Sequence, residues 1–539
     1  MTTAIASSPA ISETPPEPGS VPSRRAVESR DPATGEVWKS FAAATPDEVT
    51  AAVARARAAQ PAWAATSLGS RIRLVRRFHE VLYKRRHDVA AVLTRENGKS
   101  AAEAFSTEIA IALDFANYYA AKTPKFLGES WHMGTSPAMM RKRARIVHEP
   151  YGVIGIIAPW NYPFMLAAAE MLPALATGNT VLLKPSEFTP STGALLGELF
   201  ADAGAGDGIV TVLQGDGVTG AALSGAEVDK VFFTGSVATG RKVALACAAR
   251  LIPCSLELGG SDAAIVLADA DVKHAASGVA WGRFSNAGQT CVAPKRVFVE
   301  APVYDAFVAE LSRIVNGLRV GAGTSAETDV TAVIRPQSVA TLSAQRDDAI
   351  ARGARVVASA KVPEGNGSYF APTVLADVPA DARVLHEETF GPLLPVVRVA
   401  NADEAVARAN ASDFGLSGSV WSADTTKATA IARRMQTGSV TINDAIIAPG
   451  MTEMPHGGVK SSGVGRSHGM EGLAECVRTK SVIADTFSGW RQAWWYGYSA
   501  EHTKGLDAYV RFAHSPNLLE RLAAIPAFLK IVLAPKRPL

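Results

Sequence analysis

Apolar runs and helical stretches alternate along the chain from Tyr151 onward. Each run is short, rich in β-branched residues and closed by Gly, Pro, Ser or Asn. The first four contain GVIGIIAPW, TVLLKPS, VTVLQG and KVFFTGS, and AAIVLAD, RVFVE, RVVASA, LPVVRVA and GSVWS follow. Buried parallel strands separated by helices give this pattern. Because there is no clean break between the halves and no repeat of fixed period, two related α/β units are predicted.

The segment before Tyr151 is predicted to be mainly helical. Apolar residues recur at helical spacing through residues 51–63 and 71–93, which indicates consecutive amphipathic helices. Residues 1–25 are rich in Ser, Pro and Glu and are predicted to be a disordered lead-in. The basic segment Met140–His148 alternates charged and apolar positions. We interpret it as an exposed edge strand, because one short cluster is a small footprint for nucleic acid.

Charge and cysteine usage narrow the classes of function. The 539 residues include 54 Lys and Arg against 51 Asp and Glu, a formal charge of +3, so no nucleic-acid partner is predicted. The spacings of Cys247, Cys254, Cys291 and Cys476 fit neither a disulfide framework nor a zinc site. No secretory signal and no run of about 18 apolar residues is visible. We therefore expect a cytoplasmic protein without a bound metal.

Residues 487–539 are rich in aromatic residues and end in a basic stretch. They contain Trp490, Trp494 and Trp495, and their apolar segment 522–534 is too short to span a bilayer. Aromatic side chains, an amphipathic segment and terminal basic residues are what an interfacial anchor needs. Two hypotheses stay open: peripheral contact with a membrane, or packing on the same subunit or on a partner copy.

Three local patterns are candidates for chemistry. At Phe232–Gly240 a predicted strand ends, two glycines follow, and a helix begins whose free N–H groups can bind a phosphate, although the pattern is not G-x-G-x-x-G. Cys291 lies in a loop of small residues whose backbone N–H groups can support a thiolate. Glu257 precedes a Gly-Gly pair at a strand end, which suits a general base. Taken singly, each pattern is more often structural.

Six motifs taken together indicate a protein family far more specifically than any of these three patterns alone. APWNYP, LLKPSE, FFTGSVATG, LELGG, NAGQTC and EETFGP occur in this order, and over about residues 30–485 the chain resembles the NAD(P)-dependent aldehyde dehydrogenase superfamily. The segments WGRFSNAGQTCVAP and PHGGVKSSGVGRSHG resemble its class 3-like, fatty-aldehyde branch. The resemblance implies an α/β fold with a Rossmann-like cofactor domain, an α/β catalytic domain and a small β arm for oligomerisation.

This family organisation predicts the parts of the chain. They are an NAD(P)-binding domain at 26–127 and 150–258, a catalytic domain at 259–441, an oligomerisation arm with the C-terminal core at 128–149 and 442–486, and the extension at 487–539. A β arm exposes strand edges that another subunit can cover, so a homodimer or homotetramer is expected.

The resemblance also assigns roles to single residues. Cys291 is the expected nucleophile, Asn161 and the Cys291 backbone N–H are the expected oxyanion donors, and Glu257 is the expected base that activates water against the thioester. The expected cofactor contacts are Trp160, Lys184, Ser186, Glu187, Gly235, Ser236, Gly240, Glu388 and Phe390. Glu187 can accept a hydrogen bond from a free 2′-hydroxyl, which favours NAD but leaves NADP open.

The expected aldehyde pocket departs from the family at some positions. Ser261 stands where the family often has Lys, and His456 stands in PHGG where it often has Phe; we interpret His456 as lining the mouth. The predicted lining is Tyr162, Met165, Ala169, Thr290, Val292, Asn443 and His456. Met165 and Ala169 lie on the face where relatives that oxidise succinate semialdehyde often place an Arg. An uncharged aliphatic or aromatic aldehyde is therefore favoured.

Other functions stay open. One is a dehydrogenase of the succinate-semialdehyde type. Another is a CoA-acylating aldehyde dehydrogenase, although such relatives typically lack the base that Glu257 provides. A catalytically inactive binding protein is disfavoured because Cys291, Glu257 and Asn161 are all retained. The leading prediction is hydrolytic oxidation of an aldehyde to the carboxylate with NAD or NADP.

Overall fold

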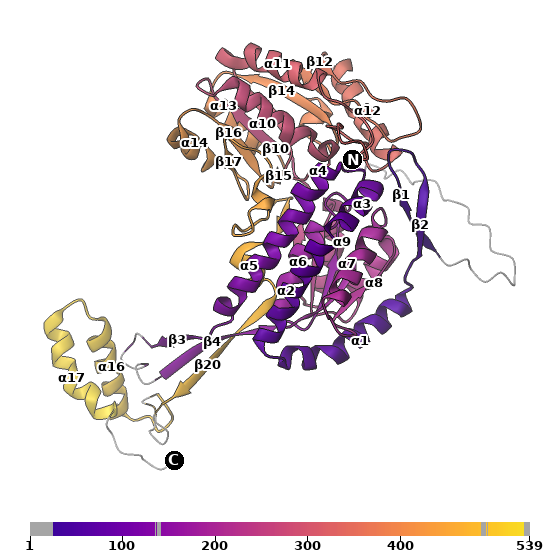
Figure 1. Cartoon of the computed structure of the whole chain (residues 1–539). Helices are drawn as coiled ribbons and strands as arrows, with labels where there is room; N and C mark the ends of the chain where they lie inside the picture. Colours follow the sequence, from indigo (N-terminus) through magenta and orange to yellow (C-terminus); the bar gives the residue numbers. More distant parts are fainter. Residues whose placement is uncertain are drawn as a thin grey trace, which may run out of the picture.

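The computed structural model describes residues 25–134, 136, 139, 142–486, 492 and 494–532. The predicted lead-in, except for Arg25, lies outside the described residues, and so do Trp490 and the C-terminal basic residues. The body consists of two α/β units. A narrow arm extends from the body, and two helices lie at the far end of the arm (Figure 1).

The first sheet has six strands in the order β19-β9-β8-β5-β6-β7. They are β5 Val153–Ile157, β6 Thr180–Lys184, β7 Val210–Val212, β8 Lys230–Thr234, β9 Cys254–Glu257 and β19 Gly463–Val464. The strands β5 to β9 are parallel. The chain runs from β5 outward through β6 and β7 and then returns to β8 on the other side of β5. This reversal creates a crevice at the carboxyl ends of β5 and β8, where open α/β sheets bind nucleotides.

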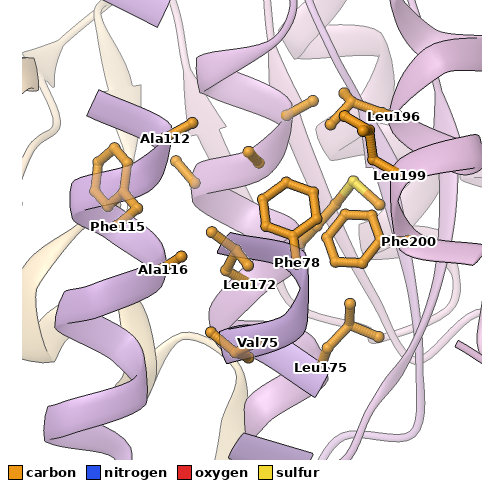
Figure 2. Packing of buried hydrophobic residues seen from close by; sticks show 14 of the residues in the cluster. Val75, Phe78, Ala112, Phe115, Ala116, Leu172, Leu175, Leu196, Leu199 and Phe200 are labelled. Atoms are coloured by element: carbon orange, nitrogen blue, oxygen red, sulfur yellow. The ribbon is translucent and has the colours of Figure 1, made fainter. Parts of the chain in front are cut away.

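Helices cover both faces of this sheet, because alternate residues of its strands point to opposite sides. Ile154 and Ile156 belong to the apolar cluster with α2, α5, α6 and α7, whereas Val153 and Ile157 belong to the cluster with α1, α8 and α9. In the first cluster Phe78 stacks on Phe200 with ring centroids 4.3 Å apart (Figure 2). The helices are α1 Pro46–Ala65, α2 Leu68–Lys84, α3 Arg86–Asn97, α5 Ala110–Phe126, α6 Met165–Ala176, α7 Pro190–Asp202, α8 Gly217–Gly225 and α9 Val237–Ala249.

The second sheet has seven strands in the order β12-β13-β14-β11-β10-β16-β17, all parallel except for β12 with β13. They are β10 Asp262–Val266, β11 Pro294–Glu300, β12 Arg355–Ser359, β13 Thr373–Ala376, β14 Leu393–Val399, β16 Gly418–Trp421 and β17 Thr441–Ile442. One face is covered by α10 Val272–Phe284, α11 Ala301–Asn316 and α12 Pro336–Ala351, and the other by α13 Ala402–Asn410 and α14 Thr425–Ala432. Every apolar run named from the sequence forms a strand of one of the two sheets.

Short elements connect these units. They are β1 Ala26–Arg30, β2 Val37–Ala42, α4 Ala101–Glu103, β15 Phe414–Gly415, β18 Val459–Lys460 and α15 Gly469–Ala474. A π-helical turn at Ala104–Ile109 precedes α5 and carries Glu108. Such turns are frequent at functional sites.

The arm is a separate three-stranded sheet. Its central strand, β4 (Lys142–Pro150), pairs antiparallel with β20 (Val477–Asp485) along its whole length and with the shorter β3 (Ser130–Met133). The expectation of an edge strand at Met140–His148 is therefore wrong. The second partner, β20, comes from the other end of the chain, and a local pattern of charged and apolar residues does not encode such a pairing.

Beyond the arm, α16 (Ala500–His514) and α17 (Leu518–Val532) pack on each other as a hairpin. Any side chain at Gly505 would collide with Ile531, and Phe512 stacks on Phe528. The Tyr509 hydroxyl is hydrogen-bonded to a serine of the arm. Within the described part of the chain, every helix is too short or too polar to cross a bilayer. The exposed apolar side chains of the hairpin are Val510, Leu518, Leu519, Leu522 and Leu529.

Candidate active site

Cys291 lies in a tight loop between α10 and β11. The loop turns at Asn286, Ala287 and Gly288, whose φ angles of 50°, 52° and 73° lie in the left-handed region. A side chain at Gly288 would overlap the backbone of Gly391, so glycine is required at this position. Non-glycine residues in the left-handed region cost free energy and cluster at active sites.

The charge state of Cys291 is dominated by burial. Desolvation raises the pKa of its thiol to about 12; Lys295 opposes this shift, whereas Asp262, Glu388 and Glu257 add to it. Lys295 has no exposed surface and donates a hydrogen bond to the carbonyl oxygen of Cys291 at 2.5 Å. This shift favours the thiol over the thiolate, so the thiolate supported by backbone N–H groups stays a prediction. Nucleophilic attack requires that Cys291 lose its proton.

Asn161 follows β5 and contacts the cysteine loop. Its side-chain Nδ2 donates to the carbonyl oxygen of Gln289 at 3.1 Å, and its own carbonyl oxygen accepts from Asn286 Nδ2 at 2.9 Å. Because an amide nitrogen carries two hydrogens, one donor remains free after the hydrogen bond to Gln289. The position fits an oxyanion donor, and removal of one such donor typically costs about 3 kcal/mol of transition-state stabilisation.

A fully buried ion pair fixes this segment. Lys99 Nζ lies 2.9 Å from Glu108 Oε1 and also donates to the carbonyl oxygen of Asn161. Glu108 Oε2 accepts from the backbone N–H groups of Phe164 and Met165, at 3.2 and 2.8 Å, and so caps the start of α6. The sequence analysis missed both charged residues. Their only local signal is a carboxylate directly before the apolar run IAIAL.

Lys99→Met is expected to lower the free energy of unfolding by about 3–5 kcal/mol, because it leaves Glu108 buried without its cation. Burial already raises the pKa of Glu108. Such a group contributes stability at low pH that is lost as pH rises through its folded pKa, so the loss in the variant should grow with pH. Urea unfolding at several pH values measures it. Lys99→Met combined with Glu108→Gln is the control; if it is no more stable than the single variant, the unpaired charge is not the cause.

Glu257 ends β9, and its carboxyl group is buried. Neither carboxyl oxygen has a hydrogen-bond partner among the described residues, and Oε2 lies 3.9 Å from His456 Nε2. Burial raises the pKa of Glu257 well above its ordinary value; Glu170 and Glu475 add to this, whereas Arg466 opposes it. Burial therefore favours the protonated form of the Glu257 carboxyl group. His456 is only 4% exposed and faces Glu257, so it does not line an open mouth as expected.

The residues expected to hold a cofactor lie at the carboxyl edge of the first sheet. Trp160 follows β5, Lys184 ends β6, and Ser236 follows β8. Ser236 caps α9 by accepting from the Thr239 N–H. Lys184 Nζ lies 3.3 Å from Glu187 Oε2. Ser186, Gly235 and Gly240 belong to the same turns or to the first turn of α9.

Two further residues reach this edge from the second unit. The ring of Phe390 meets that of Trp160 edge-on, with centroids 5.4 Å apart. Glu388 Oε1 accepts from the Gly260 N–H at 3.0 Å and lies 3.7 Å from Lys295 Nζ. A helix N-terminus for phosphate, carboxylates for ribose hydroxyls and a pair of aromatic rings suit a dinucleotide. The residues present therefore fit a nicotinamide nucleotide.

The residues expected in the aldehyde pocket do not all come together. The Tyr162 hydroxyl lies 2.7 Å from Thr290 Oγ1, directly before Cys291 in the chain. Met165 and Ala169 are buried in the apolar cluster with α2 and α5. The side-chain amide of Asn443 binds both backbone groups of the residue after β16, at 2.9 Å each. Asn443 therefore anchors the chain after β17.

Comparisons with known proteins identify relatives of this chain. The chain matches the aldehyde dehydrogenase family over residues 20–482. It is 37% identical to a 4,4'-diapolycopene aldehyde oxidase of Methylomonas sp, over 91% of this chain and 92% of that protein. It is 38% identical to a succinate-semialdehyde dehydrogenase [NADP(+)] of Deinococcus radiodurans, over 84% and 94%. The crystal structure of an NAD-dependent aldehyde dehydrogenase from Sinorhizobium meliloti superposes with a TM-score of 0.83 at 35% identity, covering 88% of this chain and 93% of that one.

Proposed function

This chain belongs to the aldehyde dehydrogenase family, and we propose that it oxidises an uncharged, apolar aldehyde to the carboxylate through a covalent intermediate on Cys291. The observation that carries the proposal is the convergence of three groups from separate segments. The Asn161 amide contacts the Cys291 loop, and the Glu257 carboxyl is close enough to Cys291 to influence its pKa. A nucleophile, an oxyanion donor and a buried carboxyl group are what acyl transfer requires.

In the acylation half, Cys291 Sγ gives its proton to solvent water and attacks the aldehyde carbon, and the C=O electron pair moves onto oxygen. The free N–H of the Asn161 amide and the Cys291 backbone N–H stabilise that oxyanion. A nicotinamide nucleotide, when bound, would supply the hydride acceptor. As the oxyanion electron pair re-forms the C=O bond, the former aldehyde carbon gives up its hydrogen as hydride and remains bound to Sγ as a thioester. In the deacylation half, Glu257 takes a proton from water while the water oxygen adds to the thioester carbon. The C–S bond then breaks, and its electron pair returns to Sγ.

The substrate proposal rests on apolar surroundings. The loop after Asn443 exposes Ile447, Met451 and Met454. Each buried CH₂ contributes roughly 0.8 kcal/mol, so affinity should rise with the length of the aldehyde. Two similarities support this choice. One is to the relative named for 4,4'-diapolycopene aldehyde, and the other is the resemblance of PHGGVKSSGVGRSHG to the class 3-like branch. The relatives named for succinate semialdehyde support the second candidate.

The test is reduced-cofactor formation with a panel of aldehydes. Straight-chain aldehydes of increasing length, benzaldehyde and succinate semialdehyde are each supplied with NAD or NADP, with and without CoA. We expect kcat/KM to rise with chain length, to be low for succinate semialdehyde and to be independent of CoA. We also expect NAD to be preferred, because Glu187 can accept from a free 2′-hydroxyl. Highest activity on succinate semialdehyde would favour the second candidate. A requirement for CoA would contradict both candidates and indicate a CoA-acylating aldehyde dehydrogenase.

We propose that the arm joins subunits. Its edge strands have no further strand partner among the described residues, and they expose Val482 and Ile483 on β20 and Trp131 and Met133 on β3. Unpaired edges with apolar side chains are a template for another chain. Sedimentation at micromolar concentration should show at least a dimer, and Ile483→Asp should shift it toward the monomer. A compact wild-type monomer would contradict the proposal.

We further propose that the extension contacts a membrane surface. Residues 487–539 carry seven Lys and Arg against three Asp and Glu, a net charge of +4 in a chain whose total is +3. The helical hairpin α16–α17 stands at the end of the arm (Figure 1) and exposes Leu518, Leu519 and Leu522 together with Trp495. Basic residues near an anionic surface contribute about 1 kcal/mol each, and apolar side chains add burial that salt does not screen.

Truncation after Asp485 is expected to release the enzyme from anionic vesicles and to lower activity on long-chain aldehydes presented in them. Activity on short aldehydes in solution should be spared. Binding of the full chain should weaken at high ionic strength without vanishing, because the apolar contacts remain. Vesicle co-sedimentation measures both effects, with Leu519→Glu as the point variant and neutral vesicles as the control. If the full chain ignores vesicles, or if truncation instead dissociates the oligomer, the extension is a packing element.

A further inference from the structure

A buried cluster of polar side chains lies behind Glu257, and the proposed chemistry does not use it. Its members are His456, His468, Glu170 and Ser467, all at most 6% exposed. The rings of His456 and His468 stack with centroids 5.4 Å apart and planes 21° from parallel. Among the described residues, Nδ1 of each histidine has no hydrogen-bond partner. Buried imidazoles without partners are costly, so their retention calls for an explanation.

The backbone holds His456 in a fixed place. His456 and Ser467 exchange two backbone hydrogen bonds, of 2.8 and 2.7 Å. The Ser467 hydroxyl donates to Glu170 Oε1 at 2.5 Å, which ties this bridge to α6. On the other side of the stack, the ring of Phe115 lies 4.5 Å from that of His468. The imidazole of His456 is therefore confined between a packed ring and the carboxyl group of Glu257.

We propose that His456 is a positioning residue for Glu257: its Nε2–H donates a hydrogen bond to the Glu257 carboxylate and so maintains the ionised form that takes a proton from water. This inference rests on the proposed function. His456 Nε2 and Glu257 Oε2 are 3.9 Å apart in this structure, and a movement of about 1 Å brings the two atoms to hydrogen-bond distance. A hydrogen bond to the charged form of an acid favours that form.

The surrounding charges make a neutral donor useful. Burial, with Arg466 adding to it, lowers the pKa of His456 to about 4, so the imidazole keeps one N–H at neutral pH. Burial lowers the pKa of His468 as well, so the stack adds no positive charge. Glu170 and Glu475 disfavour an ionised Glu257, whereas Arg466 favours it. Of these groups, His456 is the one that lies 3.9 Å from a Glu257 oxygen.

A matched pair of variants tests the role. His456→Gln can place an N–H where Nε2 was, whereas His456→Asn can reach only the position of Nδ1. Pre-steady-state NADH formation at several pH values separates the acylation burst from the later deacylation rate. With His456→Asn, we expect an unchanged burst and deacylation about tenfold slower at pH 7, because a hydrogen bond to a charged group is lost. The rise of the deacylation rate with pH should move to higher pH, and His456→Gln should restore much of the rate.

The outcomes separate this inference from the proposed function. If the wild-type enzyme forms no NADH with any aldehyde, the proposed function fails. If the wild type turns over and His456→Asn has the same deacylation rate and pH profile, His456 does not position Glu257. Equal losses of burst and deacylation in both variants indicate a structural effect and also overturn the inference. His468→Asn keeps Glu257 and His456 intact and is expected to leave the pH profile within about twofold of wild type, since its ring backs the stack without touching the carboxylate.

Discussion

Replacement of Cys291 by alanine is expected to abolish NADH formation with every aldehyde and to leave nucleotide binding almost unchanged. The thiol supplies the covalent bond on which both halves of the reaction depend, so its loss should cost on the order of 10⁴-fold or more in kcat. The contacts expected to hold the nucleotide come from other residues, including Ser236 at the start of α9 and the Trp160–Phe390 pair. Steady-state rates and isothermal titration with NAD measure the two properties separately.

Cys254→Ala is the matched control for this experiment, because Cys254 lies on β9 beside Cys247 and outside the proposed chemistry. It should keep wild-type turnover. Alkylation adds an independent check: burial raises the pKa of the Cys291 thiol to about 12, so its reaction with iodoacetamide should be slow at pH 7 and accelerate as pH rises. Substantial turnover in Cys291→Ala would remove the residue from the mechanism.

The parts of the fold that local chemistry dictates could be predicted from the sequence. A run such as TVLLK is apolar on both faces, so it is a buried parallel strand wherever it occurs, and it forms β6. The position of Cys291 in a tight loop follows in the same way from Gly288 and its small neighbours. These predictions succeed because each depends on a few adjacent residues.

Pairings between distant segments could not be predicted in this way. The pattern of Met140–His148 predicts an edge strand, because nothing local shows that β20, from the other end of the chain, pairs with β4. The ion pair of Lys99 and Glu108 is invisible because helical periodicity does not show which charged residues a second unit will bury. The interpretation of His456 failed for the same reason, since its burial depends on a bridge to Ser467.

Charge states depend on burial that only the three-dimensional structure supplies. The motif around Cys291 suggests a thiolate, yet desolvation outweighs the nearby Lys295 and keeps the proton on sulfur. Burial likewise raises the pKa of the Glu257 carboxyl group, although the sequence assigns this residue as a base.

Glu257→Gln is expected to stop turnover after a single round rather than to prevent the first one. Acylation uses Cys291 and the oxyanion donors, so one equivalent of NADH per active site should appear at a near-normal rate. Deacylation then lacks its base and should slow by about 10²–10⁴-fold, because that is what a positioned general base contributes. Stopped-flow absorbance shows the burst, and intact-protein mass spectrometry detects the acyl group on Cys291.

The pH dependence gives this prediction a second and sharper readout. In the wild-type enzyme the raised pKa of Glu257 means that the fraction of ionised base, and with it the deacylation rate, grows as pH rises. Glutamine does not ionise, so the residual deacylation of the variant should lose that rise. Glu364→Gln, at an exposed glutamate, serves as the control and should keep both turnover and profile. Steady turnover at the wild-type rate in Glu257→Gln would show that another group activates water. The positioning role inferred for His456 would then also be wrong, because that role acts through Glu257.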